Sequence, residues 1–256
     1  MNDLFISLFL APLLIGQGLY TRLTTPKLPE AAGERYGIEG SGLPLKLFIL
    51  GDSAAAGVGV KDQNQALAGQ LIAKLSSHFS IEWRLEAQTG LKTYEAIKKL
   101  EEIDAFTTDI VVVSLGVNDV TSPISLQKWL QHQERLRALL VSKFNARQIL
   151  LFNIPPMNLF PALPQPLRWY LGRRSSAFNS AMRQQALEFL ELEYTHIDFP
   201  ATREFIADDG FHPSHLAYTF WSDIAAKSIQ LRHEKASDGN GCYVGKSNSR
   251  SPKSSR

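Results

Sequence analysis

Between residues 46 and 231, short apolar runs alternate with longer segments whose apolar residues recur at helical spacing. The short runs are typical of strands buried in a parallel sheet. They span residues 46–50, 81–87, 110–115, 148–153 and 194–197, and the helical segments span 66–79, 94–103, 126–144, 176–191 and 214–231. Because strands and helices take turns, we expect one α/β domain with a five-stranded parallel sheet and right-handed crossovers.

Functional groups of a parallel α/β sheet collect where the strands end, at the carboxyl edge. The segments that directly follow the first four predicted strands are therefore the places to look for chemistry. They are residues 51–53, 88–90, 116–119 and 154–157.

The first of these segments contains Ser53, in Gly51-Asp52-Ser53, just after a predicted strand. A serine at a strand-to-helix turn is well placed as a nucleophile, because the next helix directs N–H groups and the positive end of its dipole there. A serine that only caps the helix or closes the turn fits this tripeptide as well.

A second group lies near the C-terminal end of the domain, in Asp209-Gly210-Phe211-His212-Pro213. A carboxylate three residues before a histidine can bind one ring nitrogen while the other faces outward, which is what the base of a serine nucleophile needs. A turn followed by a helix cap explains the same residues. Asp208 is a rival for the orienting role, and His215 is expected on the surface or in packing.

Two further residues are suited to stabilising an oxyanion. Asn118, in Gly116-Val117-Asn118-Asp119 after the third strand, offers an amide N–H. Gly90, after the second strand, lets a backbone N–H approach a ligand closely. Both are equally compatible with plain turns.

The joint order of Ser53, Gly90, Asn118 and His212 resembles the four sequence blocks of the SGNH (GDSL-type) hydrolase family, over about residues 46–231. The resemblance implies a flavodoxin-like, three-layer α/β/α sandwich that hydrolyses esters. Ser53 would be the nucleophile, His212 the base and Asp209 its orienter, with the Ser53 and Gly90 N–H groups and the Asn118 side chain forming the oxyanion hole.

The first block reads GDSAAAG, without the leucine that gives the GDSL type its name, and the second block, around Gly90, is a looser match. A G-x-S-x-G elbow is absent around Ser53, which argues against the α/β-hydrolase fold.

The segment 153–173 follows the fourth strand and is apolar and rich in proline. We expect it to border the site and to receive an acyl or aryl group, with Met157, Phe160 and Trp169 as candidate substrate contacts. A packed surface loop is the alternative.

The two ends of the chain differ from the domain in composition. Residues 4–20 are strongly apolar and suggest a signal, a membrane anchor or a packed arm, residues 21–44 suggest a linker, and residues 232–256 suggest a basic disordered tail. We expect a protein that is either membrane-associated through residues 4–20 or cytoplasmic, with a periplasmic or secreted location less favoured.

Charge and cysteine content exclude several classes of function. The chain has 27 Lys+Arg against 25 Asp+Glu, and removing the six basic and two acidic residues of the tail leaves the rest at −2. This balance predicts no nucleic-acid partner. The single cysteine, Cys242, excludes cysteine-rich zinc sites, and no metal or other cofactor is expected.

These observations favour a serine esterase or lipase-like enzyme that acts on small-molecule or lipid esters through an acyl-enzyme. A carbohydrate O-deacetylase on the same scaffold is the nearest catalytic alternative. A catalytically silent, membrane-tethered binding module is the alternative from another class.

Overall fold

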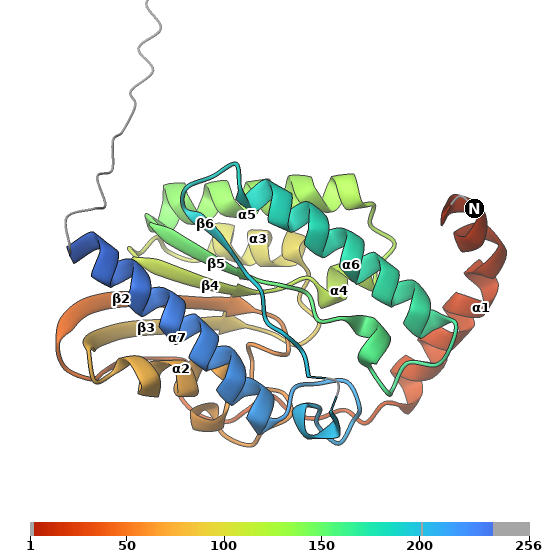
Figure 1. Ribbon diagram of the computed structural model, residues 1–256, viewed down its shortest axis with the longest axis horizontal. Coiled ribbons are helices and arrows are strands. Elements are labelled where there is room, and N and C mark those ends of the chain that lie inside the picture. The colour runs from red at the N-terminus through yellow and green to blue at the C-terminus, as the bar shows by residue number, and fades with distance from the viewer. Residues whose placement is uncertain (1–2, 201, 238–256) are drawn as a thin grey trace, which may run out of the picture.

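The computed structural model describes residues 3–200 and 202–237, and a twisted sheet runs through its centre (Figure 1). The strands of this sheet are β1 (Tyr36–Glu39), β2 (Leu43–Gly51), β3 (Phe79–Ala87), β4 (Ile110–Ser114), β5 (Gln148–Phe152) and β6 (Leu192–Thr195). The α-helices are α1 (Asp3–Thr24), α2 (Leu67–Leu75), α3 (Thr93–Glu102), α4 (Val117–Val120), α5 (Leu126–Phe144), α6 (Leu167–Ala186) and α7 (His215–Ser237). Short 3-10 turns occupy Gln63–Gln65, Met157–Leu159 and Arg203–Phe205.

The strand order is β1-β3-β2-β4-β5-β6, and β2 to β6 are all parallel. This order of the five parallel strands is the flavodoxin-like one. The predicted parallel sheet and fold class are therefore confirmed.

A sixth strand, β1, pairs antiparallel with β3 and was not expected. It lies inside the segment 21–44 that was interpreted as a linker, which is wrong for these residues. The strand has only four residues and is largely exposed at the sheet edge, so it lacks the buried apolar run from which the other strands were predicted. The next strand also begins within that segment, at Leu43.

Helices cover both faces of the sheet and give three layers (Figure 1). On one face, side chains of β2, β4 and β5 pack against α3, α5 and α6, around the fully buried Trp129 and Phe144. On the other face, the alternate side chains of the strands pack against α2 and α7, around Leu71 and Tyr218. Strands that are buried on both faces explain the continuous apolar runs of the sequence.

Several element boundaries differ from expectation, most clearly those of α2 and α6. Helix α2 ends at Leu75 because β3 begins at Phe79. Helix α6 begins at Leu167, nine residues before the expected start at 176, directly after Pro166. Proline is favoured at the start of a helix, so the proline-rich run ends in a helix rather than continuing as a loop.

The C-terminal helix α7 continues to Ser237, so the boundary of the expected tail at residue 232 is wrong. The remainder of that tail, residues 238–256 with Cys242, lies outside the described residues.

The N-terminal helix α1 lies beside α6, and its N-terminal end points away from the sheet (Figure 1). One side packs on the body through the buried Leu14, and Gln17 donates to the Gln165 carbonyl and accepts from the Leu167 amide. The other side is open: Ile15, Leu19 and Leu23 are 71%, 58% and 75% exposed. Among the described helices, none meets the length and hydropathy needed to cross a membrane.

Candidate active site

The carboxyl ends of β2, β3 and β4 meet at one edge of the sheet, where Gly51 is in register with Ala87 on one side and Ser114 on the other. A side chain at Gly51 would place Cβ only 2.6 Å from the Ser114 carbonyl oxygen and 2.4 Å from the Ala55 Cβ. Glycine is therefore required there, and its absence of a side chain lets the chain turn sharply just before Ser53.

Ser53 and His212 are 159 residues apart in sequence, yet the His212 Nε2 lies 3.0 Å from the Ser53 Oγ. The other ring nitrogen, Nδ1, is 2.5 Å from the Asp209 Oδ2. The three side chains thus form one continuous hydrogen-bonded chain, hydroxyl to imidazole to carboxylate. Such a chain can accept the hydroxyl proton and stabilise the imidazolium that results.

Asp209 is fully buried at its side chain, and its carboxylate is held from two directions. Besides the imidazole, it accepts hydrogen bonds of 3.0 Å from the amides of Phe211 and His212. Burial acts to raise the pKa of Asp209, but the hydrogen bonds from His212 and these amides outweigh it and hold the pKa below its usual value. The carboxylate is therefore charged at neutral pH, as an orienting group for histidine must be.

The two other candidates near this pair lie elsewhere. Asp208 is exposed. His215 is also exposed, and its Nδ1 is 3.4 Å from both the Gln65 carbonyl and the Gln70 amide nitrogen. Neither of them takes part in the Ser53–His212–Asp209 chain.

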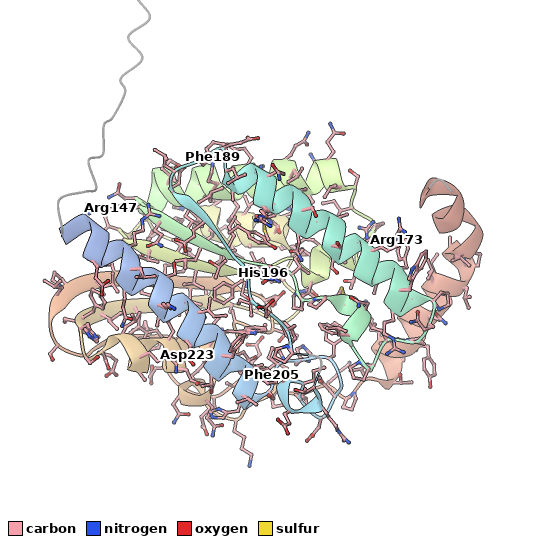
Figure 2. All side chains as sticks on the ribbon, in the orientation of Figure 1. Arg147, Arg173, Phe189, His196, Phe205 and Asp223 are labelled. Atoms are coloured by element: carbon pink, nitrogen blue, oxygen red, sulfur yellow. The ribbon has the colours of Figure 1, made fainter. Side chains whose placement is uncertain are left out.

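The loop that carries His212 is braced against α7. The Ala207 amide donates to the His212 carbonyl at 2.7 Å, and the Ser214 amide donates to the Phe205 carbonyl at 3.1 Å. Phe205, labelled in Figure 2 near the start of α7, packs edge-on against Phe220.

Ser53 sits at the start of a series of turns rather than at a direct strand-to-helix turn. The next helix, α2, begins at Leu67, close to the predicted start at 66. The Ala56 amide closes the first turn on the Asp52 carbonyl, and the Val58 amide closes the next on the Ser53 carbonyl. The buried Tyr218 hydroxyl then donates to the Val58 carbonyl at 2.7 Å, which ties this loop to α7.

Asn118 lies on the short helix α4, directly after β4. Its Nδ2 donates to the Asp52 Oδ2 at 3.3 Å and to the Leu91 carbonyl at 3.2 Å. Both distances are at the long end of the range for hydrogen bonds. The amide thus lies beside the residue that precedes Ser53 and beside the residue that follows Gly90.

Gly90 occupies a tight turn after β3, with a positive φ of +83°. A Cβ built there would meet nothing within 4 Å, so the space in front of this residue is open. Within the described part of the chain, the amides of Ser53 and Gly90 have no hydrogen-bond partner. Both N–H groups are therefore free to bind a ligand oxygen.

Several residues that support this site were not expected from the sequence. Asp119 accepts hydrogen bonds from the amide and hydroxyl of Thr93, which joins α4 to α3. Arg174 reaches from α6 and donates to the carbonyls of Val120, Ser122 and Ile124, which fixes the loop behind Asn118. Such partners lie far away in sequence and leave no local pattern from which to predict them.

The three candidate substrate contacts do not gather at the site. Met157 and Phe160 are 0% and 2% exposed and belong to the core. Phe160 packs edge-on against Phe211, so it supports the loop of His212. Trp169 is exposed on α6, 5.4 Å from the Arg173 guanidinium that Figure 2 labels. The structure corrects the expectation of an open apolar loop formed by these residues.

No cluster of three or more His, Cys, Asp or Glu residues suited to a metal ion occurs in the described ranges.

A family sequence profile described as the GDSL-like Lipase/Acylhydrolase family matches residues 49–220, which is more than half of the chain. A comparison with curated protein sequences found no match.

Solved structures with the same fold include an esterase and a carbohydrate esterase. The psychrotrophic esterase EstA from Pseudoalteromonas sp., inhibited by monoethylphosphonate, has a TM-score of 0.57 at 20% identity and covers 74% of this chain and 98% of its own. A family 3 carbohydrate esterase of Clostridium thermocellum has a TM-score of 0.58 at 17% sequence identity, and the match covers 75% of this chain and 99% of the esterase. TesA has a TM-score of 0.56 at 19% sequence identity, and the match covers 73% of this chain and 98% of TesA. At these identities the likeness establishes the fold.

Proposed function

This chain belongs to the GDSL-like lipase/acylhydrolase family and is an ester-cleaving hydrolase, and on that basis we propose that it cleaves carboxylic esters through an acyl-enzyme formed on Ser53. The observation that carries this proposal is the hydrogen-bonded chain from the Ser53 Oγ through the His212 imidazole to the buried Asp209 carboxylate. A serine with such a base beside it becomes a nucleophile at neutral pH.

In the proposed mechanism, His212 Nε2 takes the hydroxyl proton as Ser53 Oγ bonds to the ester carbonyl carbon. The resulting oxyanion is bound by the N–H groups of Ser53 and Gly90 and by the Asn118 amide, which exchanges one of its long contacts for the ligand oxygen. The imidazolium then gives its proton to the alkoxy oxygen as the bond from this oxygen to the former carbonyl carbon breaks, which releases the alcohol and leaves the acyl group on the Ser53 Oγ. Water repeats the sequence, releasing the acid and restoring Ser53.

The test is hydrolysis of p-nitrophenyl esters over a series of acyl chain lengths, with Ser53→Ala compared with the wild type. We expect Ser53→Ala to lose ~10³-fold or more in kcat, since removal of a triad residue has this scale of effect. Ser41→Ala is the matched control, because Ser41 is exposed and its hydroxyl has no partner in the described structure. Hydrolysis that survives in Ser53→Ala would refute the proposal.

A carbohydrate O-deacetylase is the second candidate. It is favoured by the structural likeness to the family 3 carbohydrate esterase, which shares this fold over three quarters of the chain. Acetylated sugars distinguish the two: a deacetylase cleaves sugar acetates and leaves longer p-nitrophenyl esters intact. A fluorophosphonate that labels no residue of the wild type would instead support a silent binding module.

We further propose that the enzyme works at a lipid surface, to which α1 attaches it. The apolar side chains on the open side of α1, chiefly Ile15, Leu19 and Leu23, support this proposal. Apolar groups that no part of the body covers gain free energy by inserting among lipid chains.

A further inference from the structure

A carboxylate from the segment between α1 and β1 holds the turn that carries Gly90. The Glu30 Oε1 accepts two hydrogen bonds from Thr89, at 2.7 Å from its amide and 2.8 Å from its hydroxyl. The other carboxylate oxygen accepts from Arg35 at 2.6 Å, and Arg35 in turn donates to the Ala87 carbonyl at 2.7 Å. Two hydrogen bonds thus fasten the turn to a distant part of the chain, and Arg35 ties Glu30 to the end of β3 just before the turn.

The turn itself is of a kind whose central peptide has two orientations. The Leu91 amide donates to the Gln88 carbonyl at 3.1 Å, and Gly90, the third residue of these four, has a φ of +83°. These are the features of a type II turn, which differs from a type I turn by a flip of the peptide between the second and third residues. That peptide joins Thr89 to Gly90, so a flip reverses the direction of the Gly90 N–H.

Packing contributes little to the choice between the two orientations. Residues 88–90 are exposed, and the space beside the Gly90 Cα is open. The bonds to Glu30 therefore supply most of the restraint on the residue directly before the flippable peptide. Glu30 is suited to the role because it is charged: burial acts to raise its pKa, but the bonds from Thr89 and Arg35 outweigh this and lower the pKa below the usual value.

We propose that Glu30, held by Arg35, is a positioning residue for ester hydrolysis: it clamps Thr89 so that the Gly90 N–H faces the oxyanion. This inference rests on the proposed function of Ser53. It adds a residue that touches no substrate and that lies outside the segments matched by the family profile. If the Thr89–Gly90 peptide is flipped in some of the molecules, the Gly90 N–H stabilises the oxyanion only in the others.

The test compares Glu30→Ala and Glu30→Gln with the wild type in steady-state hydrolysis of one p-nitrophenyl ester. We expect kcat to fall ~10- to 100-fold in Glu30→Ala while KM changes less than about two-fold. The loss is smaller than the ~10²- to 10³-fold cost of removing one oxyanion donor, because the Gly90 N–H is turned away in only part of the molecules. The rate of inactivation by a fluorophosphonate should fall in parallel, because that reaction also builds charge on an oxygen in the hole. Glu30→Gln keeps one oxygen as an acceptor for Thr89 and should lie between the two.

Glu34→Gln is the matched control, since Glu34 is an exposed carboxylate of the same segment and has no partner in the described structure. It should hydrolyse the ester like the wild type. A second pair tests the receiving side of the clamp: Thr89→Ser retains the hydroxyl and the activity, whereas Thr89→Val loses one bond and part of kcat.

A folded Glu30→Ala with a lower melting temperature and an unchanged kcat would show a purely structural role and overturn the inference. A rise in KM alone would do the same, since it would indicate a substrate contact. Failure of the proposed function looks different: the wild type would then hydrolyse no ester, or Ser53→Ala would be as active as the wild type.

Discussion

Asp52 is the buried neighbour of the proposed nucleophile and links two parts of the site. It is 2% exposed, its Oδ1 accepts from the Ala54 amide, and its Oδ2 accepts from Asn118. The pKa of Asp52 is raised to about 7, chiefly by burial. The Ala54 amide and the charge of His212 act to lower this pKa, and the nearby Asp119 acts to raise it. A carboxylate thus orients the amide that we propose as an oxyanion donor.

Removing that donor should slow the reaction without preventing binding. We expect Asn118→Ala to reduce kcat by ~10²- to 10³-fold with a small change in KM, because the interaction strengthens only as charge develops on the oxygen. Steady-state kinetics with a p-nitrophenyl ester measures this effect. Asn64→Ala is the control, because Asn64 is exposed and forms no hydrogen bond in the described structure; a wild-type kcat in Asn118→Ala would exclude the assigned role.

The raised pKa of Asp52 makes stability depend on pH in a defined direction. The unfolded chain loses this proton near the ordinary value of 3.8, whereas the folded protein keeps it until about pH 7. Between these values the unfolded state binds fewer protons, so the contribution of Asp52 to stability falls as pH rises and levels off above pH 7.

We therefore expect Asp52→Asn to gain melting temperature relative to the wild type as pH is raised from 4 to 8. The gain should be several degrees, since a change of 1 kcal/mol shifts the melting temperature of such a domain by ~2–4 °C. Thermal denaturation of both proteins across this pH range measures the gain. Any constant offset at pH 4 reflects altered hydrogen bonds, and a difference that stays constant with pH would contradict the prediction.

At the scale of elements, two loops from opposite ends of the domain approach each other so closely that only glycine fits between them. Gly59, with a φ of +105°, belongs to the loop after Ser53, and a Cβ there would lie 2.2 Å from the Pro213 carbonyl oxygen. The contact is with backbone, which cannot rotate aside. The distance between Ser53 and His212 therefore depends on this glycine.

Gly59→Ala should separate the two loops and weaken the contact between Ser53 and His212. We expect a loss of at least ~10-fold in kcat, as small misplacement of reacting groups is costly, together with a lower melting temperature. Kinetics and thermal denaturation of the purified variant test both effects. Gly16→Ala is the control, because a Cβ at this helical glycine meets nothing within 4 Å; equal behaviour of the two variants would contradict the prediction.

At the scale of the whole molecule, α1 gives the protein a second, separate surface. Its inner side is fixed to α6 by Leu14 and Gln17, while its outer side presents apolar residues to solvent. None of these outer residues belongs to the hydrogen-bonded chain of Ser53, His212 and Asp209. Attachment and hydrolysis should therefore be separable by mutation.

Replacing Ile15, Leu19 and Leu23 together by serine should abolish co-flotation with phospholipid vesicles. Hydrolysis of a soluble p-nitrophenyl ester should remain at the wild-type level, because none of these residues contacts the site. Flotation and kinetics on the same preparations provide the measurement. Wild-type protein that stays at the bottom of the gradient would rule out the attachment we propose.

The sequence by itself determined the parallel sheet, most element positions and the residues to which we assign chemistry. Helix α5 has the predicted bounds, and most core residues on both faces come from the predicted strands and helices. Ser53, His212 and Asp209 were identifiable because each lies after a strand or before a helix, with partners near in sequence or in a characteristic order. A local pattern of apolar residues predicts local structure, since the periodicity of a helix or strand appears in residues that are close in the chain.

Only the tertiary structure decided which groups meet across long distances in the chain. In the folded chain Ser53 lies beside His212, and Glu30 lies beside Thr89. Arg174 donates to three carbonyls behind Asn118, and β1 is a strand because it pairs with β3. The tertiary structure also moved Met157 and Phe160 from an expected binding loop into the core. Each of these outcomes depends on hydrogen bonds or packing between residues far apart in sequence, whose free energy exists only once the folded chain brings them together.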